Sequence, residues 1–174
     1  MPPATRVPPF DPAARRGVVY RTAVRFGRTP VGYRYGVKLA ARVDPTLLRL
    51  SGGRMHLTLV LPTAHLTTVG AKSGEARTVA VLYFTDGDDA ILIASSFGRE
   101  RHPAWYHNLK ANPEATLLRA GSGGRYQAAE VADPAEHDRL YGLAEQMYAG
   151  YADYKARTAA IGRHIPIMRL TPLQ

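Results

Sequence analysis

The chain has 174 residues, a formal net charge of +9 and no cysteine. Its length suits one domain with a core of its own. The absence of cysteine excludes disulfides, thiolate metal ligands and cysteine nucleophiles, and it is compatible with a cytoplasmic protein. No apolar run approaches the roughly 18–20 residues needed to span a bilayer, and no apolar signal core follows Met1, so we expect no export.

The positive charge is concentrated in the first third of the chain. Residues 1–56 contain eleven Lys and Arg but only two acidic residues, Asp11 and Asp44, whereas the remainder balances twelve bases with twelve acids. We therefore predict a basic N-terminal leader, residues 1–49, followed by a neutral domain of residues 50–174.

The leader begins with a proline-rich segment, residues 1–12, which we expect to be poorly ordered. A basic amphipathic helix is predicted over residues 13–28, because its arginines and its apolar residues fall on opposite sides (Arg21, Arg25 and Arg28 against Val19, Ala23 and Phe26).

Three roles for residues 13–42 remain open from the sequence. They could lie on an anionic membrane surface, cover the active site of their own domain, or form a solvated helix docked on that domain. We expect no nucleic-acid partner, because the aromatic residues of this region fit no recognised nucleic-acid motif (Tyr20, Phe26, Tyr33 and Tyr35).

For the domain itself, the sequence predicts short strands and few helices. A short helix capped by Asp44 ends at Leu50. Apolar and β-branched runs then predict strands over 55–61, 65–69, 79–84, 90–95, 116–119, 126–132 and 165–170. Helices are predicted over 101–111 and 134–147. This order predicts a mainly β fold, a closed or half-closed antiparallel barrel with helices packed outside.

Residues 66–77 predict a hairpin whose tip could bind an anion. Gly70 and Gly74 bracket the turn, and Lys72 and Arg77 lie on or just after it. Cations, hydroxyl groups and free backbone N–H groups together suit a phosphate (the hydroxyls are Thr67, Thr68 and Ser73). The alternative is that both cations are ordinary solvated turn residues. A Walker phosphate loop is excluded, because Thr67 stands where its first glycine is required.

The rest of the chain offers no self-sufficient catalytic centre. The six histidines form no pair spaced for zinc, so we predict no metal site. No serine elbow and no acid pair is evident. A protein without reactive groups of its own, built around an anion cradle, is consistent with chemistry supplied by a cofactor.

Two long motifs point to a known family. Residues 66–77 and residues 102–113 (His-Pro-Ala-Trp-Tyr-His-Asn-Leu-Lys-Ala-Asn-Pro) resemble the signature of the deazaflavin-dependent nitroreductases, as does the tail at 164–170. The resemblance runs from about Leu50 to Pro172. It implies a six-stranded split β-barrel, related to the FMN-binding barrels of pyridoxamine-phosphate-oxidase-like proteins.

The same resemblance implies coenzyme F420, a deazaflavin with a phosphate and an oligoglutamate tail. The residues that it assigns to the cofactor are Lys72, Ser73, Arg77, Thr78, Val79, Ala80, Ala94, Ser95, Ser96, Gly98, Trp105 and Asn108. Trp105 and Asn108 lie one helical turn apart and can face the site together, although Trp105 could equally anchor its helix to the barrel. The chain departs from the family at Val79 and Ala80, where Asn-Pro or Thr-Pro is frequent.

Tyr148, Tyr151 and Tyr154 match the tyrosines that nitroreductase-like members place beside the substrate. We predict that they act with Ser95 as catalytic residues, since phenols can hydrogen-bond a nitro or quinone oxygen. The alternative is a helix stripe that only packs on the barrel.

The sequence therefore predicts an F420H2-dependent oxidoreductase that transfers a hydride to a quinone-like or nitroaromatic acceptor. An FMN-dependent oxidoreductase on the same barrel and a non-catalytic, membrane-associated F420-binding protein remain the alternatives. We expect a cytoplasmic protein, with the leader as its candidate contact to the inner face of the cell membrane. Monomer and homodimer stay open.

Overall fold

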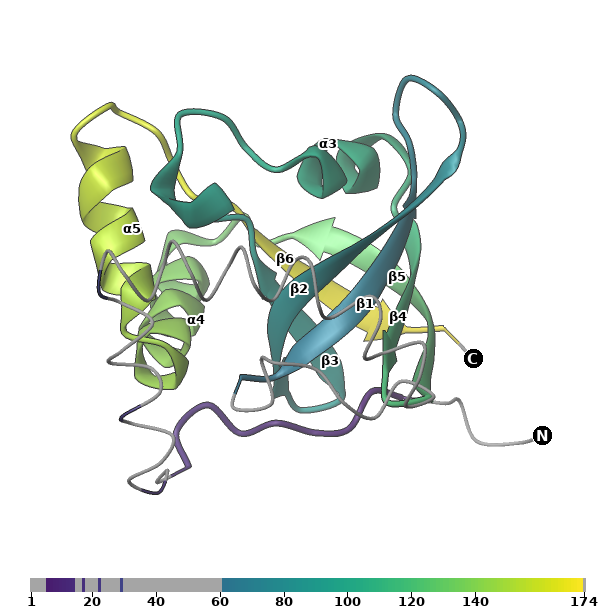
Figure 1. The fold of residues 1–174 in the computed structure, drawn as a ribbon, viewed down its shortest axis with the longest axis horizontal. Coiled ribbons are helices and arrows are strands. Elements are labelled where there is room, and N and C mark those ends of the chain that lie inside the picture. Colours follow the sequence, from purple (N-terminus) through teal and green to yellow (C-terminus); the bar gives the residue numbers. More distant parts are fainter. Residues whose placement is uncertain (1–5, 15–16, 18–21, 23–28, 30–60, 174) are drawn as a thin grey trace.

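The fold is a closed six-stranded antiparallel barrel with helices outside it (Figure 1). The computed structural model describes residues 6–14, 17, 22, 29 and 61–173. Its strands are β1 (Thr63–Val69), β2 (Ala76–Asp86), β3 (Asp89–Ile93), β4 (Glu114–Arg119), β5 (Ser122–Glu130) and β6 (Ile167–Pro172). Its helices are the short 3₁₀ turn η1 (Ser96–Gly98), α3 (Ala104–Ala111), α4 (Pro134–Met147) and α5 (Gly150–Ala159).

The strands follow the order β1-β2-β3-β6-β5-β4, and β1 pairs with β4 to close the barrel. Every neighbouring pair is antiparallel. The sequence prediction of a mainly β barrel with external helices is therefore confirmed. Asp133 caps α4 as its position before Pro134 predicts, because its carboxylate accepts the Glu136 N–H at 3.2 Å.

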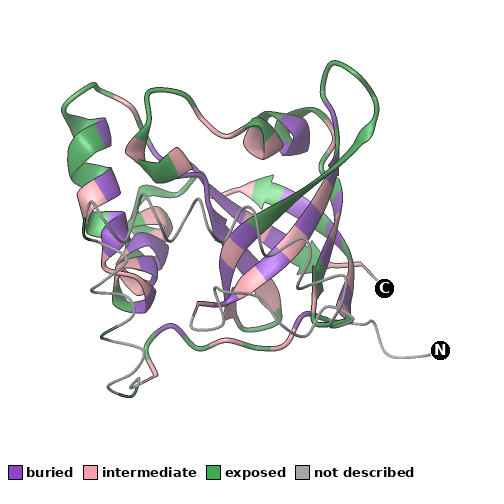
Figure 2. Cartoon of the chain, viewed as in Figure 1, coloured by how far each residue is buried: buried purple, intermediate pink, exposed green. Residues whose placement is uncertain are grey.

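Two apolar cores hold the molecule together (Figure 2). The first fills the barrel, where alternate strand residues point inward (among them Leu66, Tyr83, Leu117, Tyr126 and Leu170, all fully buried). The second lies between the barrel wall and the helices α4 and α5 (it includes Phe84, Ile91, Leu140, Tyr141 and Tyr151). The helices thus bury one side of the sheet that β2, β3 and β6 form.

The N-terminal segment closes one end of the barrel, so the prediction of poor order over residues 1–12 is wrong for residues 6–12. Val7 is only 5% exposed within the barrel core, and its N–H donates to the Tyr126 hydroxyl at 2.9 Å. Tyr83 donates to the Pro8 carbonyl at 2.7 Å. Residues 7 and 8 are bonded to the barrel although they form no helix or strand, because tyrosine side chains satisfy their backbone polar groups.

The turn between β4 and β5 also differs from the prediction. The predicted strands 116–119 and 126–132 leave the glycine-rich stretch 121–124 in the connection between them, but β5 already starts at Ser122 and the chain reverses at Ala120 and Gly121. A Cβ atom on Gly123 would come closer than 3.0 Å to the Leu117 carbonyl oxygen. This glycine permits close approach of two strands, a use that the sequence does not distinguish from a turn.

Several predictions lie outside the described residues. They are most of the basic helix 13–28, the short helix before Leu50 and the strand 55–61. Pro12 and Ala13 form a turn, so the basic helix does not begin at Ala13. The boundary between leader and domain at residue 49 stays a prediction. Within the described part of the chain, no helix is long and apolar enough to cross a membrane.

Candidate functional site

Most of the predicted site residues gather at the end of the barrel opposite the N-terminal segment. The β1–β2 hairpin, α3 and η1 lie at this end, and α5 flanks η1 (Figure 1). Hairpin and helix are joined through side chains, as described below. We call this region the hairpin end.

The tip of the β1–β2 hairpin is a tight, internally bonded turn. Gly70 donates to the Glu75 carbonyl at 2.8 Å, and Gly74 donates to the Gly70 carbonyl at 2.9 Å. Gly74 has φ of +68°, which glycine adopts without strain. Gly70 leaves room for the Ser73 hydroxyl, which stands 2.5 Å from where a Cβ would be. Both glycines thus bracket the turn as the sequence predicts, but only Gly74 takes the positive φ, and Gly70 serves by leaving space.

The tip retains donors that no described residue uses. The Lys72 side chain is exposed and makes no ion pair with a described residue, and the N–H groups of Lys72 and Ser73 have no described acceptor. Arg77 differs, because its guanidinium donates to Glu75 at 2.6 Å. Lys72 and Ser73 are therefore ready to receive an anion, whereas Arg77 must exchange its carboxylate partner.

The half of β2 next to the tip is exposed from Ala76 to Ala80. Its register places Val79 opposite Leu66, and therefore on the face of the barrel interior. Thr78 lies on the outer face, where its hydroxyl meets that of Thr67 at 2.8 Å. Because side chains alternate along a strand, Arg77 and Val79 share one face, and Thr78 and Ala80 share the other. A planar ligand on one face meets only one of these pairs through side chains.

Asn108 on α3 fixes the hairpin to the helix. It is only 9% exposed. Its Oδ1 accepts the Ala71 N–H at 3.0 Å, and its Nδ2 donates to the Thr68 hydroxyl at 3.0 Å. Both ends of the amide thus have protein partners, which makes Asn108 a positioning residue for the tip. Trp105, one turn earlier, is half-buried and packs on the barrel core.

The loop after β3 has an unusual backbone. Ser96, Phe97 and Gly98 all lie in the left-handed region, with φ of 50°, 58° and 72°. Glycine suits position 98, because its φ is positive and a Cβ on it would stand 3.2 Å from Tyr154 Cα, a tight contact with backbone. Ser95 opens this turn; it is 9% exposed and its hydroxyl has no described partner. We call Ser95–Gly98 the Ser95 turn.

Ala94, immediately before the Ser95 turn, is fully buried, and its N–H donates to the Pro166 carbonyl at 2.9 Å. In this conformation no ligand reaches its side chain. Ala94 therefore packs beneath the Ser95 turn inside the protein, whereas the sequence analysis placed it on the surface that contacts the cofactor.

The three predicted tyrosines form a cluster, although they do not share one helix. Tyr148 is extended, with φ of −145°, so α4 ends before it and α5 begins two residues later. The ring centroids nevertheless lie 5.7 to 6.2 Å apart. Tyr151 and Tyr154 are buried at 3% and 8% exposure, and Tyr148 is half-buried with a hydroxyl that bonds to no described residue. We call these residues the tyrosine cluster.

Phe97 connects the Ser95 turn to this cluster. Its ring meets Tyr154 edge-on at a centroid distance of 6.1 Å, and it remains 43% exposed. The sequence analysis did not select Phe97, because an aromatic residue in a predicted loop carries no distinctive pattern. The Ser95 turn and the tyrosine cluster thus form one continuous wall.

Two further residues were missed. Arg163, after α5, donates through Nη2 to the Ser95 carbonyl at 2.5 Å, and its Nη1 lies 2.8 Å from His102 Nδ1. Burial lowers the pKa of His102, and the charge of Arg163 lowers it further. Because an arginine only donates, His102 accepts as a neutral imidazole. No spacing in the sequence links these positions, which are brought together by the fold alone.

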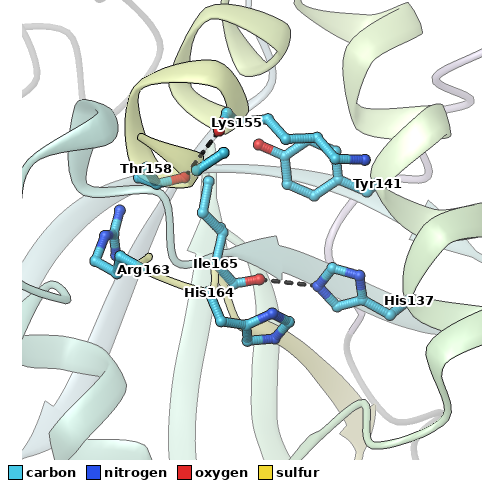
Figure 3. A pocket seen from close by; sticks show the side chains of 8 residues that line it. His137, Tyr141, Lys155, Thr158, Arg163, His164 and Ile165 are labelled. Carbon is cyan, nitrogen blue, oxygen red and sulfur yellow. Dashed lines mark hydrogen bonds between the residues drawn. The ribbon is translucent and has the colours of Figure 1, made fainter. Parts of the chain in front are cut away.

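A separate cavity of about 190 Å³ lies between α4, α5 and the segment before β6 (Figure 3). His137 contacts the Ile165 carbonyl oxygen through Nε2 at 2.9 Å, and the Lys155 ammonium lies 5.1 Å from the centre of the Tyr141 ring. None of the predicted site residues lines this cavity. Among the described residues, no group of acidic residues and histidines could hold a metal ion.

Comparison with known proteins decides the family. Residues 40–172 match the family model described as F420H(2)-dependent quinone reductase, and this match covers most of the chain. The chain belongs to the F420H2-dependent quinone reductase family. The prediction of an F420-dependent reductase on a split barrel is thereby confirmed, and the cofactor is F420 rather than FMN. The family members are oxidoreductases, so the non-catalytic alternative is set aside.

Individual relatives agree with this assignment. An F420H2-dependent quinone reductase of Mycobacterium tuberculosis is 35% identical over 141 residues, which cover 78% of this chain and 91% of the relative. A solved F420-H2-dependent reductase, FDR-A, is 32% identical with a TM-score of 0.56, over 63% of this chain and 93% of that one. A structure described as a domain-swapped dimer is 31% identical with a TM-score of 0.58, over 73% and 94%.

Proposed function

We propose that this enzyme reduces a quinone with F420H2 at the hairpin end, between the β1–β2 hairpin, α3, the Ser95 turn and the tyrosine cluster. The observation that carries the proposal is the family match across residues 40–172. The local support is Lys72, an exposed cation without a described carboxylate partner, beside two backbone N–H groups that bond to no described residue.

The residues present fit F420 on chemical grounds. Its phosphate and tail carboxylates need cations and N–H donors, which Lys72 and Ser73 provide, with Arg77 added when Glu75 is displaced. Its planar ring needs exposed apolar surface, and Val79 and Phe97 are 38% and 43% exposed. When bound, F420H2 supplies the hydride that reduces the acceptor.

Each element then has a defined task. The backbone of Thr78, Val79 and Ala80 and the turn residues Ser95, Ser96 and Gly98 would together hold the deazaflavin ring. Trp105 and Asn108 hold α3 against the hairpin, and Ala94 supports the Ser95 turn. The protein thus binds the two reactants, orients them toward each other and excludes water from around them. Holding them in this way lowers the entropic part of the activation barrier.

The acceptor is assigned to the tyrosine cluster. The Tyr148 hydroxyl is the donor that hydrogen-bonds the quinone oxygen where negative charge develops, because it has no described partner of its own. Tyr151 and Tyr154 form an apolar floor beneath the acceptor ring. A nitroaromatic acceptor presents similar oxygens on a similar ring, so we include it in the proposed substrate class.

A fluorescence titration with F420 tests the site. Loss of one charge-assisted phosphate contact in Lys72→Ala should weaken F420 binding roughly tenfold or more. Arg125→Ala is the control, because Arg125 pairs with Glu114 at an exposed position on the barrel wall. Equal affinity of the wild type and Lys72→Ala would remove Lys72 from the site, and tighter binding of FMN than of F420 would contradict the cofactor.

The basic leader supports a proposed contact with anionic membranes, where lipid quinones are found. The support is the excess of eleven bases over two acids in residues 1–56. Because Val7 is part of the barrel core, the test replaces Arg21, Arg25 and Arg28 with Gln instead of deleting the segment. Co-sedimentation with anionic vesicles should fall in this variant and with added salt. Undiminished binding would contradict the proposal.

A homodimer is proposed as the assembly, supported by the related structure that is described as a domain-swapped dimer. Light scattering on the purified protein tests it, and a mass of one chain, about 19.0 kDa, would contradict it.

A further inference from the structure

Arg163 lies where three segments of the hairpin end meet. Its own N–H donates to the Thr158 carbonyl at 2.9 Å, which fixes it to the end of α5. Its guanidinium reaches the Ser95 carbonyl after β3 and the His102 ring before α3. No carboxylate among the described residues lies within ion-pair distance of it, and its buried Nε has no described partner. The guanidinium is thus used on a backbone carbonyl and an imidazole instead of on an acid.

Arg163 donates to the Ser95 carbonyl, which is also the acceptor of the hydrogen bond that closes the Ser95 turn. The Ser95 oxygen also accepts the Gly98 N–H at 2.9 Å, and Arg99 donates to the Ser96 carbonyl at 3.1 Å. Ser96 and Phe97 are non-glycine residues in the left-handed region, a conformation that persists only where the surroundings impose it. A charge-assisted bond from Arg163 to the first carbonyl of the turn is such an imposed restraint.

His102 makes this restraint dependent on protonation. It accepts from Arg163 only while Nδ1 carries no proton. Among the residues that the structure describes, the charged and titratable groups that face His102 are Arg163, Tyr106 and His107 of α3, His164 before β6, and Glu130 of β5. Glu130 alone favours the imidazolium, and it is already engaged by Lys110 and Tyr106. Protonation of His102 places two cations in contact and breaks the bridge.

We infer that Arg163 is a positioning residue that locks the Ser95 turn in the shape that receives F420, and that neutral His102 completes the lock. The inference rests on the proposed function, because it takes the Ser95 turn as one side of the cofactor site. In this role Arg163 needs no contact with the cofactor or the substrate. It acts through the Ser95 carbonyl.

Hydrogen exchange of the full-length protein without cofactor tests the lock directly. In Arg163→Met, the protection factors of the Gly98 and Arg99 amides should fall about tenfold or more, while amides of the β4–β5 pair keep theirs. Arg125→Met removes the same charge at an exposed pair with Glu114 and should leave the turn protected. Unchanged protection of Gly98 and Arg99 in Arg163→Met would overturn the inference.

A second experiment tests whether protonation of His102 releases the Ser95 turn. Protection of the same two amides in the wild type should decrease on acidification through the pKa of His102, after correction for intrinsic exchange. In His102→Asn, the amide oxygen can accept from Arg163 but cannot titrate, so protection should persist at low pH. Equal acid sensitivity of wild type and His102→Asn would overturn the role of His102.

A third experiment, F420 binding by the same variants, distinguishes a failure of this inference from a failure of the proposed function. Arg163→Met should bind F420 about tenfold more weakly than the wild type, and Arg125→Met should match the wild type. Lower protection with unchanged F420 affinity would overturn the assignment of the lock to cofactor binding. A wild type that does not bind F420 would contradict the proposed function, and the exchange data would still decide whether Arg163 holds the turn.

Discussion

Asn108 accepts the Ala71 N–H through Oδ1 at 3.0 Å, so one side chain of α3 fixes the tip of the β1–β2 hairpin. The same amide donates to the buried Thr68 hydroxyl. The orientation of Lys72, one residue after Ala71, thereby depends on a helix that lies about forty residues further along the chain.

Asn108→Ala should therefore disturb both the fold and the site. Two hydrogen bonds are lost and the buried Thr68 hydroxyl loses a donor, which should lower the free energy of unfolding by about 1–3 kcal/mol. F420 affinity should fall as well, because the tip is no longer fixed. Asn112→Ala is the control, since its amide reaches the Val69 carbonyl only at 3.5 Å. Unchanged denaturation and F420 titration curves for Asn108→Ala would contradict this role.

Tyr148→Phe tests the proposed donor to the acceptor. Loss of the hydroxyl should lower kcat/KM for a quinone about tenfold or more, while the Kd for F420 stays the same, because the hydroxyl meets the acceptor alone. Tyr126→Phe is a suitable control, as its hydroxyl accepts the Val7 N–H at the opposite end of the barrel. Wild-type kcat/KM in Tyr148→Phe would remove this phenol from the reaction.

Gly150 and Gly142 form a matched pair in neighbouring helices. A Cβ on Gly150 would come closer than 3.0 Å to the Tyr148 ring, whereas a Cβ on Gly142 would meet nothing within 4 Å. Gly150→Ala should displace Tyr148 and reduce quinone turnover. Gly142→Ala should raise the free energy of unfolding by up to about 1 kcal/mol with normal turnover, because alanine favours the helix. Normal turnover in Gly150→Ala would show that the ring position is unimportant.

Asp86 makes stability depend on pH at the opposite end of the barrel. It accepts from Arg139 at 2.7 Å and from Arg169 at 3.0 Å, and the Arg139 bond is the main reason that its pKa is lowered. A lowered folded-state pKa gives stability that is present above the unfolded pKa, about 3.9, and is lost as the pH falls through the folded value.

Asp86→Asn should thus lower the free energy of unfolding by about 1–3 kcal/mol at neutral pH, and the difference from wild type should shrink below about pH 4. Denaturant titrations at several pH values measure it. Asp138→Asn is the control, because its carboxylate is exposed. A difference that stays constant down to low pH would contradict the charge pairing.

Val7 tests whether the N-terminal segment belongs to the barrel. Val7→Ala removes two buried methyl groups and should cost about 1–3 kcal/mol of unfolding free energy. Arg6→Gln, at the neighbouring exposed pair with Asp88, should change it by less than about 1 kcal/mol. Equal stabilities of the two variants would show that the segment contributes nothing to the core.

The barrel was predictable because its strands and glycines follow local rules. Alternation of apolar residues gives Thr63–Val69 one face inside, and Gly74 takes the left-handed conformation that the hairpin needs. The family motifs then identified the cofactor. Local pattern failed at Val7, because nothing in a proline-rich segment reveals that Tyr126 will accept from its backbone N–H or that Tyr83 will donate to the Pro8 carbonyl.

The sequence predicted which residues lie at the site better than it predicted what each of them contacts. Lys72 lies where the sequence places it, but Asn108 uses both ends of its amide within the protein, and Ala94 is buried. Arg163 and His102 were missed because sixty-one positions separate them, and only the packed barrel brings them to 2.8 Å. Such tertiary contacts leave no periodic trace in a single sequence.

The central claim is that F420 binds at the hairpin end. A hydrogen-exchange footprint of the wild type with and without F420 tests it most directly. We predict added protection over 70–78 and 95–99, and none at Asp86–Asp89 or along α4. Protection confined to the α4–α5 cavity, or no protection at saturating F420, would contradict the claim.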